Sequence, residues 1–485
     1  MTTDIYPGKR LSFSSHLCTI RYHGPVTGTT GSWLGVEWDD PTRGKHSGSH
    51  QGTQYFTCLN PSPTSASFIR PTRKPDSARS FVQALKAKYA SEEDEDGNEG
   101  FQDPDVEVVF NYQAPQQQKP DRKPVLFNGK PAEEIGFDKI RRQLAQLSEL
   151  KILILDGLCM QRPEAWRAGW MKSDEKTDVR DACPKAIELD LSRNLFEEWR
   201  EVAAICEQLP ELRRLRVDGT RFRDTSLTDA ERERCKKAFT GITSLKLEDT
   251  LLSWADLADL THLFPSLTTF SASSNLYTEL TSHTPNPTVV DLTLEDNHIT
   301  SLASIECLAK LPNLQRLILK SNNISEIASA NASAPSFPNS VREVDLSFNE
   351  ITTWSFIEEL IHVFPGLQSL RVSHNPLYGS LQAPDGRALT ADDGYMLTLA
   401  RLGQLKTLNH SPINEKERLN AESYYLSMIA KEVQFAPENL RDQILKSHPS
   451  VLPALSTRIP SPLACFASSF TALIPLLMRW RLKSR

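Results

Sequence analysis

The chain has 485 residues, of which 39% are hydrophobic and 24% charged, and its formal net charge is −6 at pH 7. This composition is ordinary for a globular protein, and the length predicts about three domains. The small acidic excess argues against a nucleic-acid-binding protein, because binding to phosphates needs a basic surface. The first residues, MTTDIYPGKRLSF, lack the apolar segment of a signal peptide, and the eight cysteines form no CxxC pair, so no zinc or dithiol site is expected.

Residues 1–75 combine Gly, Thr, Ser and aromatic residues with short apolar runs, which is typical of a small all-β domain. The loop Gly44-Lys45-His46-Ser47-Gly48 is the strongest candidate binding element in this segment. Its two glycines allow backbone angles that are closed to other residues, and we expect them to leave N–H groups open to a ligand. Lys45 supplies a positive charge for a carboxylate, and His46 adds a hydrogen-bond donor.

Several aromatic residues flank this loop. Trp33, Tyr55 and Phe56 are candidates for the apolar walls of a groove that takes an aromatic side chain, and each is also compatible with a purely core role. For Trp33 and Phe56 we favour a mixed role in core and groove. For Trp38 we favour the core alone.

The segment 32–58, SWLGVEWDDPTRGKHSGSHQGTQYFTC, resembles the CAP-Gly family, whose signature is G-K-N/H-D-G with a flanking W-x-G-V-E and Y-F. The resemblance implies an SH3-like β-barrel that binds the acidic C-terminal tails of tubulin and related tails ending in an aromatic residue. Ser47 stands where the family usually has Asp. The loss of that carboxylate removes a hydrogen-bond acceptor, so we expect a tail affinity that differs from the family norm.

Residues 76–125 begin with one short helical stretch, SARSFVQALKAKYA, at 77–90. The acidic run SEEDEDGNEG follows, and then YQAPQQQKPDRKP. Acidic residues, Gln and Pro together cannot bury a core, so this segment predicts a solvated linker.

The segment 126–440 repeats the pattern L-x-x-L-x-L-x-x-N-x-(I/L/F), as in LQRLILKSNNI at 314–324. From residue 194 onward the Asn-type positions are 22 to 30 residues apart, which matches the ~20–29 residues of a leucine-rich repeat. Each x-L-x-L-x predicts a short strand, and the Asn side chain is expected to satisfy backbone groups of the following turn. Helical stretches separate the strands. The stack predicts an α/β solenoid with a parallel concave sheet.

The strand positions that point away from the core are the expected recognition surface of such a solenoid. Acidic and basic residues alternate in bands over these positions, which suits a protein surface of complementary charge better than a phosphate backbone. A concave face that is only hydrophilic is the other interpretation. The candidates for protein binding on this face are Arg214, Arg216, Asp291, Glu295, Arg316, Lys320, Glu343, Asp345 and Arg371.

Residues 405–426 look like the polar helical cap of a repeat array, which covers the apolar face of the last repeat. Residues 441–485 continue no earlier pattern, and no ubiquitin-like domain is recognisable in them. Their apolar run at 463–478 is shorter than the ~20 residues of a membrane span. We therefore favour a truncated or misread terminal segment, disordered or loosely packed, over a membrane anchor.

The order of a CAP-Gly domain, acidic linker, leucine-rich repeats and cap resembles the tubulin-folding cofactor E family, which normally ends in a ubiquitin-like domain. The resemblance implies a cytoplasmic, cytoskeleton-associated chaperone that binds α-tubulin. The CAP-Gly domain would take the acidic C-terminal tail and the repeats the tubulin body. With other tubulin-folding cofactors, such a protein takes part in folding, assembly or dissociation of the αβ-tubulin heterodimer.

Two other functions compete with this one. A microtubule-associated adaptor would use the same CAP-Gly domain for tubulin tails and the repeats for another protein cargo. An enzyme would need a catalytic or metal-binding arrangement, and the histidines and cysteines of residues 1–75 have no such spacing. We therefore expect no catalytic residue, no cofactor and no metal.

Overall fold

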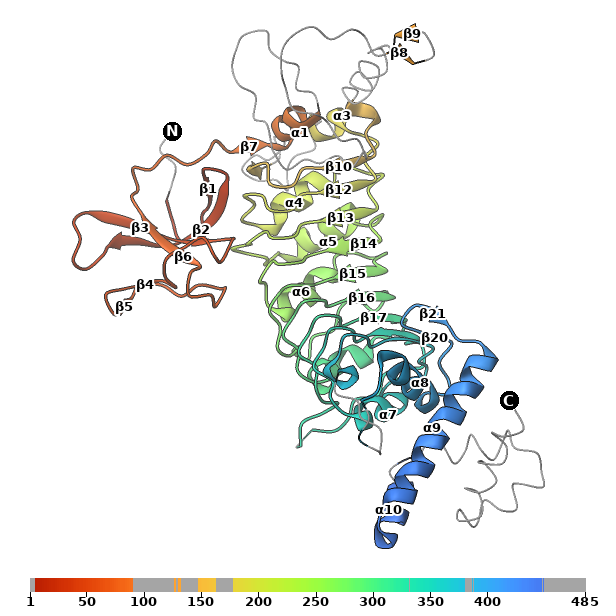
Figure 1. Ribbon diagram of the computed structural model, residues 1–485. Coiled ribbons are helices and arrows are strands. Elements are labelled where there is room, and N and C mark those ends of the chain that lie inside the picture. The colour runs from red at the N-terminus through yellow and green to blue at the C-terminus, as the bar shows by residue number, and fades with distance from the viewer. Residues whose placement is uncertain are drawn as a thin grey trace. The chain divides into compact units, whose positions relative to one another are not determined.

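The computed structural model of the chain describes residues 5–89, 126–127, 130–131, 147–162, 178–330, 332–379, 386, 388–446 and 448. The chain divides into two compact units, residues 1–242 and 243–485. The first unit contains an all-β domain and the first repeats (Figure 1). The second contains the remaining repeats and the C-terminal helices.

The N-terminal domain is built on an antiparallel sheet with strand order β1-β2-β3-β6. The strands of the domain are β1 (Arg10–Phe13), β2 (His16–Pro25), β3 (Ser32–Trp38), the hairpin β4 (Ser49–His50) and β5 (Thr53–Gln54), and β6 (Ala66–Ile69). In β2, Cys18 and Ile20 point into the core, where they meet Phe13 and Trp38, because alternate side chains of a strand share one face. The predicted small all-β domain is confirmed.

The helix expected at 77–90 is present as α1 (Phe81–Tyr89), but it is not solvated. Its side chains Phe81, Val82 and Leu85 are buried, and α1 contacts α3 (Asp178–Ala182) and β11 (Met160–Arg162). Just before it, β7 (Arg79–Ser80) pairs in parallel with β11. The predicted linker 76–125 therefore starts with a segment that packs on the first repeats, and its acidic and Gln-rich parts lie outside the described residues.

The repeats of the first unit contribute parallel strands that pair in register, as Leu153 with Leu189 and Leu189 with Leu215. These strands are β10 (Ile152–Ile154), β12 (Glu188–Asp190) and β13 (Arg214–Arg216). The 3₁₀ helix η1 (Leu147–Glu149) precedes these strands in the chain. Helix α4 (Trp199–Cys206) follows β12, helix α5 (Asp229–Ala238) follows β13, and both lie beside the strands (Figure 1). A separate hairpin joins β8 (Leu126–Phe127) to β9 (Lys130–Pro131).

The second unit continues the same pattern, with neighbouring strands again parallel and in register. Its strands are β14 (Ser244–Lys246), β15 (Thr269–Ser271), β16 (Asp291–Thr293), β17 (Arg316–Ile318), β18 (Glu343–Asp345), β19 (Ser369–Arg371) and β20 (Thr407–Leu408), with β21 (Ser411–Pro412) antiparallel to β20. Between them lie α6 (Trp254–Thr261), η3 (Ala303–Lys310), α7 (Trp354–Val363) and η4 (Pro376–Tyr378). The predicted repeat fold, with parallel strands and intervening helices, is confirmed.

The repeat asparagines act as predicted. The Asn349 amide donates to the Leu346 carbonyl at 3.2 Å and, across the repeat boundary, to the Leu319 carbonyl at 2.9 Å, while its oxygen accepts from the Ile324 N–H at 2.9 Å. Each such side chain therefore fastens its own turn to the preceding repeat. Where Asn is replaced by Thr250, the hydroxyl donates to Asn275 of the next repeat at 2.9 Å, so part of the function is retained.

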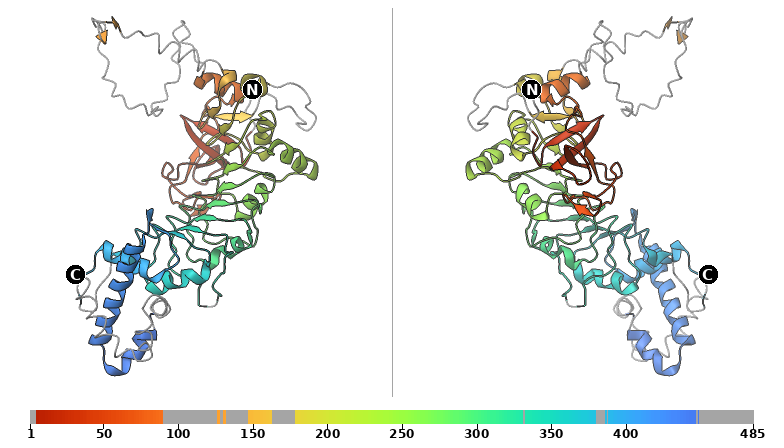
Figure 2. Two further views of the ribbon diagram at one scale, coloured as in Figure 1. Left: turned by 90° about the vertical axis from the view of Figure 1, so that its right-hand side faces the viewer. Right: turned by 90° about the vertical axis from the view of Figure 1, so that its left-hand side faces the viewer.

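The array ends in helices α8 (Ala391–Arg401), α9 (Glu415–Phe435) and α10 (Arg441–Lys446), with the short η5 (Glu438–Leu440) before α10 (Figure 2). Side chains of α9, including Tyr425 and Ile429, pack with Leu397 of α8 in a small core. The range 405–426, where a polar helical cap was expected, contains strands β20 and β21 and the first half of α9. Within the described residues, no helix is both long and apolar enough to cross a membrane. The apolar run 463–478 lies outside them.

Candidate functional site

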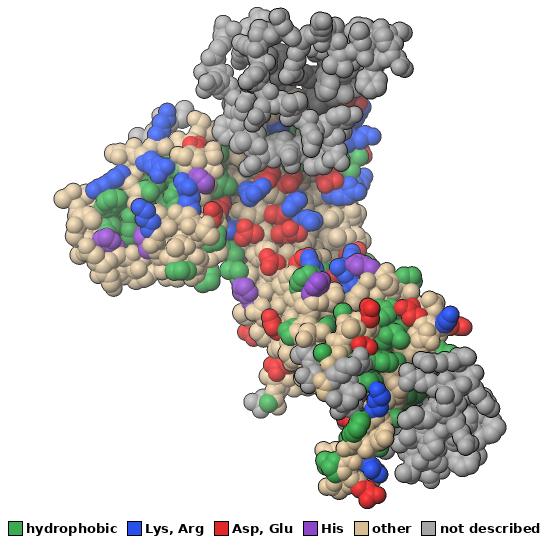
Figure 3. Space-filling model, viewed as in Figure 1, with side chains coloured by type: hydrophobic (Ala, Val, Ile, Leu, Met, Phe, Trp, Pro, Cys, Tyr) green, Lys and Arg blue, Asp and Glu red, His purple; other side chains and the backbone are tan. Residues whose placement is uncertain are grey.

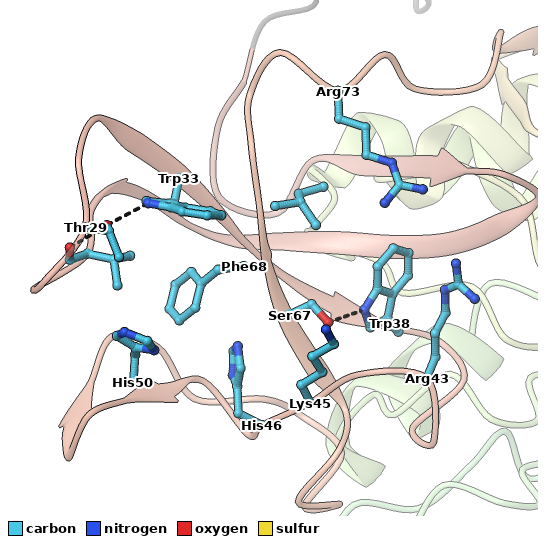
Figure 4. Close-up of a pocket in the computed structure, with 12 residues that line it drawn as sticks. Thr29, Trp33, Trp38, Arg43, Lys45, His46, His50, Ser67, Phe68 and Arg73 are labelled. Atoms are coloured by element: carbon cyan, nitrogen blue, oxygen red, sulfur yellow. Dashed lines mark hydrogen bonds between the residues drawn. The ribbon is translucent and has the colours of Figure 1, made fainter.

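A groove on the N-terminal domain is a candidate site within the part of the chain that the structure describes. It encloses about 490 Å³, which is within the range of ligand pockets. Its walls come from β3, the loop after β3, the hairpin strand β4 and strand β6 (Figure 4). Of the residues that the sequence predicts for tail binding, Trp33, Lys45 and His46 line it.

One end of the groove is aromatic. Figure 4 shows Phe68 between Trp33 and His46, and the rings of Phe68 and His46 are 4.8 Å apart. The Trp33 indole N–H donates to the Thr29 hydroxyl at 2.8 Å, and the Arg70 guanidinium lies 3.7 Å above its ring. These contacts hold the rings in place, so that a slot is ready for a flat apolar side chain.

The other end of the groove is cationic. Lys45, Arg43 and Arg73 line it, with the guanidinium of Arg43 lying 4.7 Å from the Trp38 ring and that of Arg73 lying 5.2 Å from the Phe13 ring. Figure 3 shows blue side chains gathered on this face of the domain. Among the described residues, none of the three cations forms an ion pair with a carboxylate. Their charge is therefore available to an acidic ligand.

The glycine loop is shaped by its own hydrogen bonds. The Lys45 N–H donates to the Ala66 carbonyl at 2.7 Å, the His46 N–H to the same carbonyl at 3.3 Å, and the Gly48 N–H to the His46 Nδ1 at 3.0 Å. These N–H groups are thus used within the domain and are not open to a ligand, contrary to expectation. Gly48 has φ +99°, as expected, whereas Gly44 is required for close approach, since a Cβ there would lie 2.3 Å from the Ala66 carbonyl.

His46 is held as the neutral imidazole. Its Nδ1 accepts a hydrogen bond from the Gly48 N–H, so the proton of the neutral ring is on Nε2. Burial, and secondarily the charge of His50, lowers the pKa of His46 below its ordinary value. At neutral pH this side chain therefore has an N–H donor on Nε2, and its role in tail binding stays a prediction.

The other predicted tail-binding residues support the groove without lining it. Phe56 is 8% exposed and lies behind the wall, with its ring 5.8 Å from that of Phe68. The Tyr55 hydroxyl accepts from the Thr27 N–H at 2.8 Å and so fixes the neighbouring turn. Ser47 belongs to the loop but does not line the cavity.

Nine lining residues were not predicted for tail binding. They are Val26, Thr29, Trp38, Arg43, His50, Ser67, Phe68, Ile69 and Arg73. Trp38, which we expected in the core alone, belongs to the core and also lines the groove. Strand β6 carries Phe68 opposite Gly35 of β3. A Cβ at Gly35 would lie 2.3 Å from the Phe56 ring, so the glycine leaves room for Phe56 behind the wall. No local motif brings these nine residues together, because they come from separate segments that meet only when the sheet forms.

The second candidate site is the strand face, by which we mean the outward-pointing side chains of the repeat strands in each unit. Figure 3 shows acidic and basic side chains intermixed over the repeats, and most of the predicted charges pair with a residue of opposite charge. The pairs are Arg214 with Glu188 at 3.0 Å, Arg316 with Glu343 at 3.1 Å, Arg371 with Asp345 at 2.8 Å, Lys320 with Glu295, and Arg216 with Asp218. Neutralised pairs attract a partner only weakly.

Two further features of the strand face concern Asp291 and Phe348. Burial raises the pKa of Asp291, an effect opposed by Arg316. Phe348 is 47% exposed, with its ring stacked on His374 at 4.1 Å and the Lys320 ammonium 5.8 Å away. Phe348 precedes the repeat asparagine, where the backbone is left-handed (φ 56°), so the prediction from strand positions missed it.

No cluster of three or more His, Cys, Asp or Glu side chains able to hold a metal ion occurs in the described part of the chain.

The fold and the groove together define a protein with a CAP-Gly domain and leucine-rich repeats. Residues 7–74 match the family model of the CAP-Gly domain, and this domain is followed by leucine-rich repeats. Among solved structures, an internalin from Listeria monocytogenes is 16% identical, with 48% of this chain and 70% of that chain covered and a TM-score of 0.27.

Curated relatives extend over nearly the whole chain. The human tubulin-specific chaperone E is 32% identical over 465 residues, which cover 93% of this chain and 78% of that protein. The zebrafish (Danio rerio) protein of the same name is 31% identical, with 88% and 73% covered, and the tubulin-folding cofactor E of Arabidopsis thaliana is 26% identical, with 87% and 73% covered. The chain belongs to the tubulin-specific chaperone E family.

Proposed function

We propose that this chain is a cytoplasmic tubulin-folding cofactor that binds α-tubulin at two places, the acidic C-terminal tail in the CAP-Gly groove and the tubulin body on the strand face. With other tubulin-folding cofactors it takes part in folding, assembly or dissociation of the αβ heterodimer. Membership of a family whose members are named for tubulin folding supports the role. Two modest sites on one chain raise the effective concentration of each ligand for the other, so neither needs high affinity.

One observation carries the tail-binding part of this proposal. The groove combines an aromatic slot around Phe68 with three cations that have no carboxylate partner among the described residues. An acidic peptide that ends in an aromatic residue has the complementary chemistry, because its carboxylates meet Lys45 and its ring enters the slot. The neutral His46 adds one donor to this set.

The test is a titration of the full chain with a fluorescent acidic tail peptide ending in tyrosine. We expect Lys45→Ala to weaken binding about tenfold, since a hydrogen bond to a charged group contributes about 1.5–3 kcal/mol. Lys74→Ala is the matched control, because Lys74 is exposed and lies outside the groove lining. A peptide without the terminal ring should bind more weakly to every variant. Equal binding by wild type and Lys45→Ala would remove the assigned groove.

Cosedimentation with microtubules separates the cofactor from the adaptor. A cofactor binds soluble tubulin and decreases the polymer, and size-exclusion chromatography should then reveal a binary complex with α-tubulin. An adaptor pellets with the polymer and leaves its amount unchanged.

A further inference from the structure

A buried carboxylate joins the CAP-Gly domain to the side of the first repeats within the first unit. Glu197 follows strand β12 and is 5% exposed. Its carboxylate forms an ion pair with the Lys9 ammonium at 2.9 Å and accepts hydrogen bonds from the Arg10 N–H at 3.2 Å and from the Tyr6 hydroxyl. All of these partners belong to residues 6–10 of the CAP-Gly domain. Because buried carboxylates are seldom left unpaired, the Glu197 environment depends on the docked domain.

Arg10 connects this contact to the groove. Its side chain is fully buried, and its guanidinium donates to both oxygens of Asp39 at 2.6 Å. The same group donates to the Asn194 carbonyl of the repeats at 3.3 Å. Asp39 begins the segment that leads to Arg43, which lines the groove. Arg10 therefore contacts both the first repeats and the start of the segment that leads to the groove.

A third contact closes the interface from the solvent side. The aliphatic part of Arg223 lies against Gly8, where a Cβ would be 2.7 Å from the Arg223 Cδ. The Arg223 guanidinium lies 5.4 Å from the Tyr6 ring and pairs with Glu198. Gly8 has φ +93°, so this close approach requires glycine.

The C-terminal end of the CAP-Gly domain is fastened as well. Asp76 accepts from the Ser12 hydroxyl at 2.5 Å, and the Arg79 N–H donates to the Cys159 carbonyl at 3.0 Å where β7 joins β11. Only a few residues separate the two contacts. The domain is thus held to the repeats at both of its ends, which leaves it no free linker about which to turn.

We infer that Glu197 is a positioning residue, which locks the CAP-Gly domain onto the first repeats so that the groove and strands β12 and β13 meet tubulin as one rigid body. A rigid arrangement avoids the entropy cost of ordering two loose domains when both sites are occupied. The tubulin part of this inference rests on the proposed function, whereas the docking itself does not.

Docking is measured as a distance distribution by electron spin resonance on the full chain. Spin labels are attached through unnatural amino acids at the exposed positions Thr53 and Lys237. We expect a single narrow distribution in wild type and a broad one in Glu197→Ala, where Lys9 is left buried without its partner. Glu197→Gln retains an acceptor for the Arg10 N–H and should be intermediate. Glu211→Ala removes an exposed glutamate and should match wild type.

The positioning role is read from two affinities of the same variants. In Glu197→Ala we expect the affinity for the tail peptide to change less than about twofold, while the affinity for whole tubulin falls about tenfold or more, because only the second depends on the fixed geometry. Retained peptide binding also shows that the CAP-Gly domain is folded. Should Glu197→Ala not fold, Arg223→Ala tests the same interface from its exposed side. We expect it to broaden the distance distribution and to lower the affinity for tubulin, each by less than Glu197→Ala would.

Three results would overturn the inference. The first is a broad distance distribution in wild type, and the second is a Glu197→Ala distribution as narrow as that of wild type. The third is an equal loss of peptide and tubulin affinity in Glu197→Ala, which would assign Glu197 to the groove alone. If wild type binds neither ligand, the proposed function fails, and the spin-label distances alone decide whether the domain is docked.

Discussion

The CAP-Gly groove and the strand face of the repeats are both charged surfaces, but they handle charge in opposite ways. In the groove, Lys45 and its neighbouring arginines have no carboxylate partner among the described residues, and they lie beside an aromatic slot. On the strand face, Arg316 pairs with Glu343, and Lys320 with Glu295. The cations of the groove can therefore pair with a ligand, whereas most charged side chains of the strand face already pair with each other.

This difference indicates what each surface contributes to binding. Unpaired cations beside an apolar slot provide attraction and anchoring together. Paired charges contribute little attraction and serve to reject partners with the wrong pattern. The exposed Phe348 on its stacked His374 is then a stronger candidate anchor on the strand face than any of its ion pairs.

The largest effect is expected from Gly44→Ala, which disrupts the packing of the groove loop and leaves the charged residues of the groove unchanged. A Cβ at this position would overlap the Ala66 and Thr64 carbonyls at 2.3 Å, and backbone atoms cannot step aside as a flexible side chain does. We expect a loss of about 3 kcal/mol in the stability of the CAP-Gly domain and loss of tail-peptide binding, measured by calorimetry and titration.

The matched control for Gly44→Ala is Gly52→Ala. Gly52 has φ +79°, and a Cβ at this position would have nothing within 4 Å, so only backbone strain of about 1 kcal/mol is expected. Equal effects of the two substitutions would show that the loop does not need its close packing against β6.

Acid should weaken the groove and leave the paired strand face less affected. The pKa of His46 is lowered in the folded protein by burial and by the charge of His50. Below the pKa of about 6.5 that histidine has in an unfolded chain, the unfolded chain takes up a proton more readily than the folded protein does. The stability of the folded protein therefore decreases as the pH is lowered. Protonation of Nδ1 also breaks the bond from the Gly48 N–H.

The measurements are the affinity for the tail peptide and the midpoint temperature of thermal unfolding, each between pH 7.5 and pH 5.5. We expect both the affinity and the midpoint temperature to decrease toward pH 5.5 in wild type. His46→Asn keeps a hydrogen-bond acceptor but does not titrate, so its profile should be flatter. Identical profiles for the two proteins would exclude His46 as the group responsible.

The fold of the repeats was predictable because each strand pairs only with its neighbours in sequence. A period of 22 to 30 residues then determines the strand order as well as the elements. The role of Asn349 and its equivalents followed from the same periodicity, since a buried turn needs a polar side chain to satisfy its backbone. The packing of α1 was missed because its surroundings in sequence are acidic and rich in Gln, and composition outweighed the short apolar stretch.

The groove was only partly predictable. Trp33, Lys45 and His46 lie in or beside a recognisable motif, whereas Phe68 and Arg73 join them through the pairing of β3 with β6, which no short pattern reveals. The pairing of charges on the strand face did have a signal. Adjacent strands lie about 4.8 Å apart, so residues of opposite charge at the same position of successive repeats meet one another before they meet a partner.

The smallest effect is expected where that internal pairing is removed. In the pair of Arg316 with Glu343, the two side chains are 47% and 38% exposed, so Arg316→Ala should change the free energy of unfolding by less than about 1 kcal/mol. Because the pair is already neutral, tubulin affinity should also change by less than about threefold.

The double variant Arg316→Ala with Glu343→Ala is the control, and it should match wild type more closely than either single variant does. A tenfold loss of tubulin affinity in Arg316→Ala, with stability unchanged, would show that the pair opens to the partner, and the contrast between groove and strand face would then not hold.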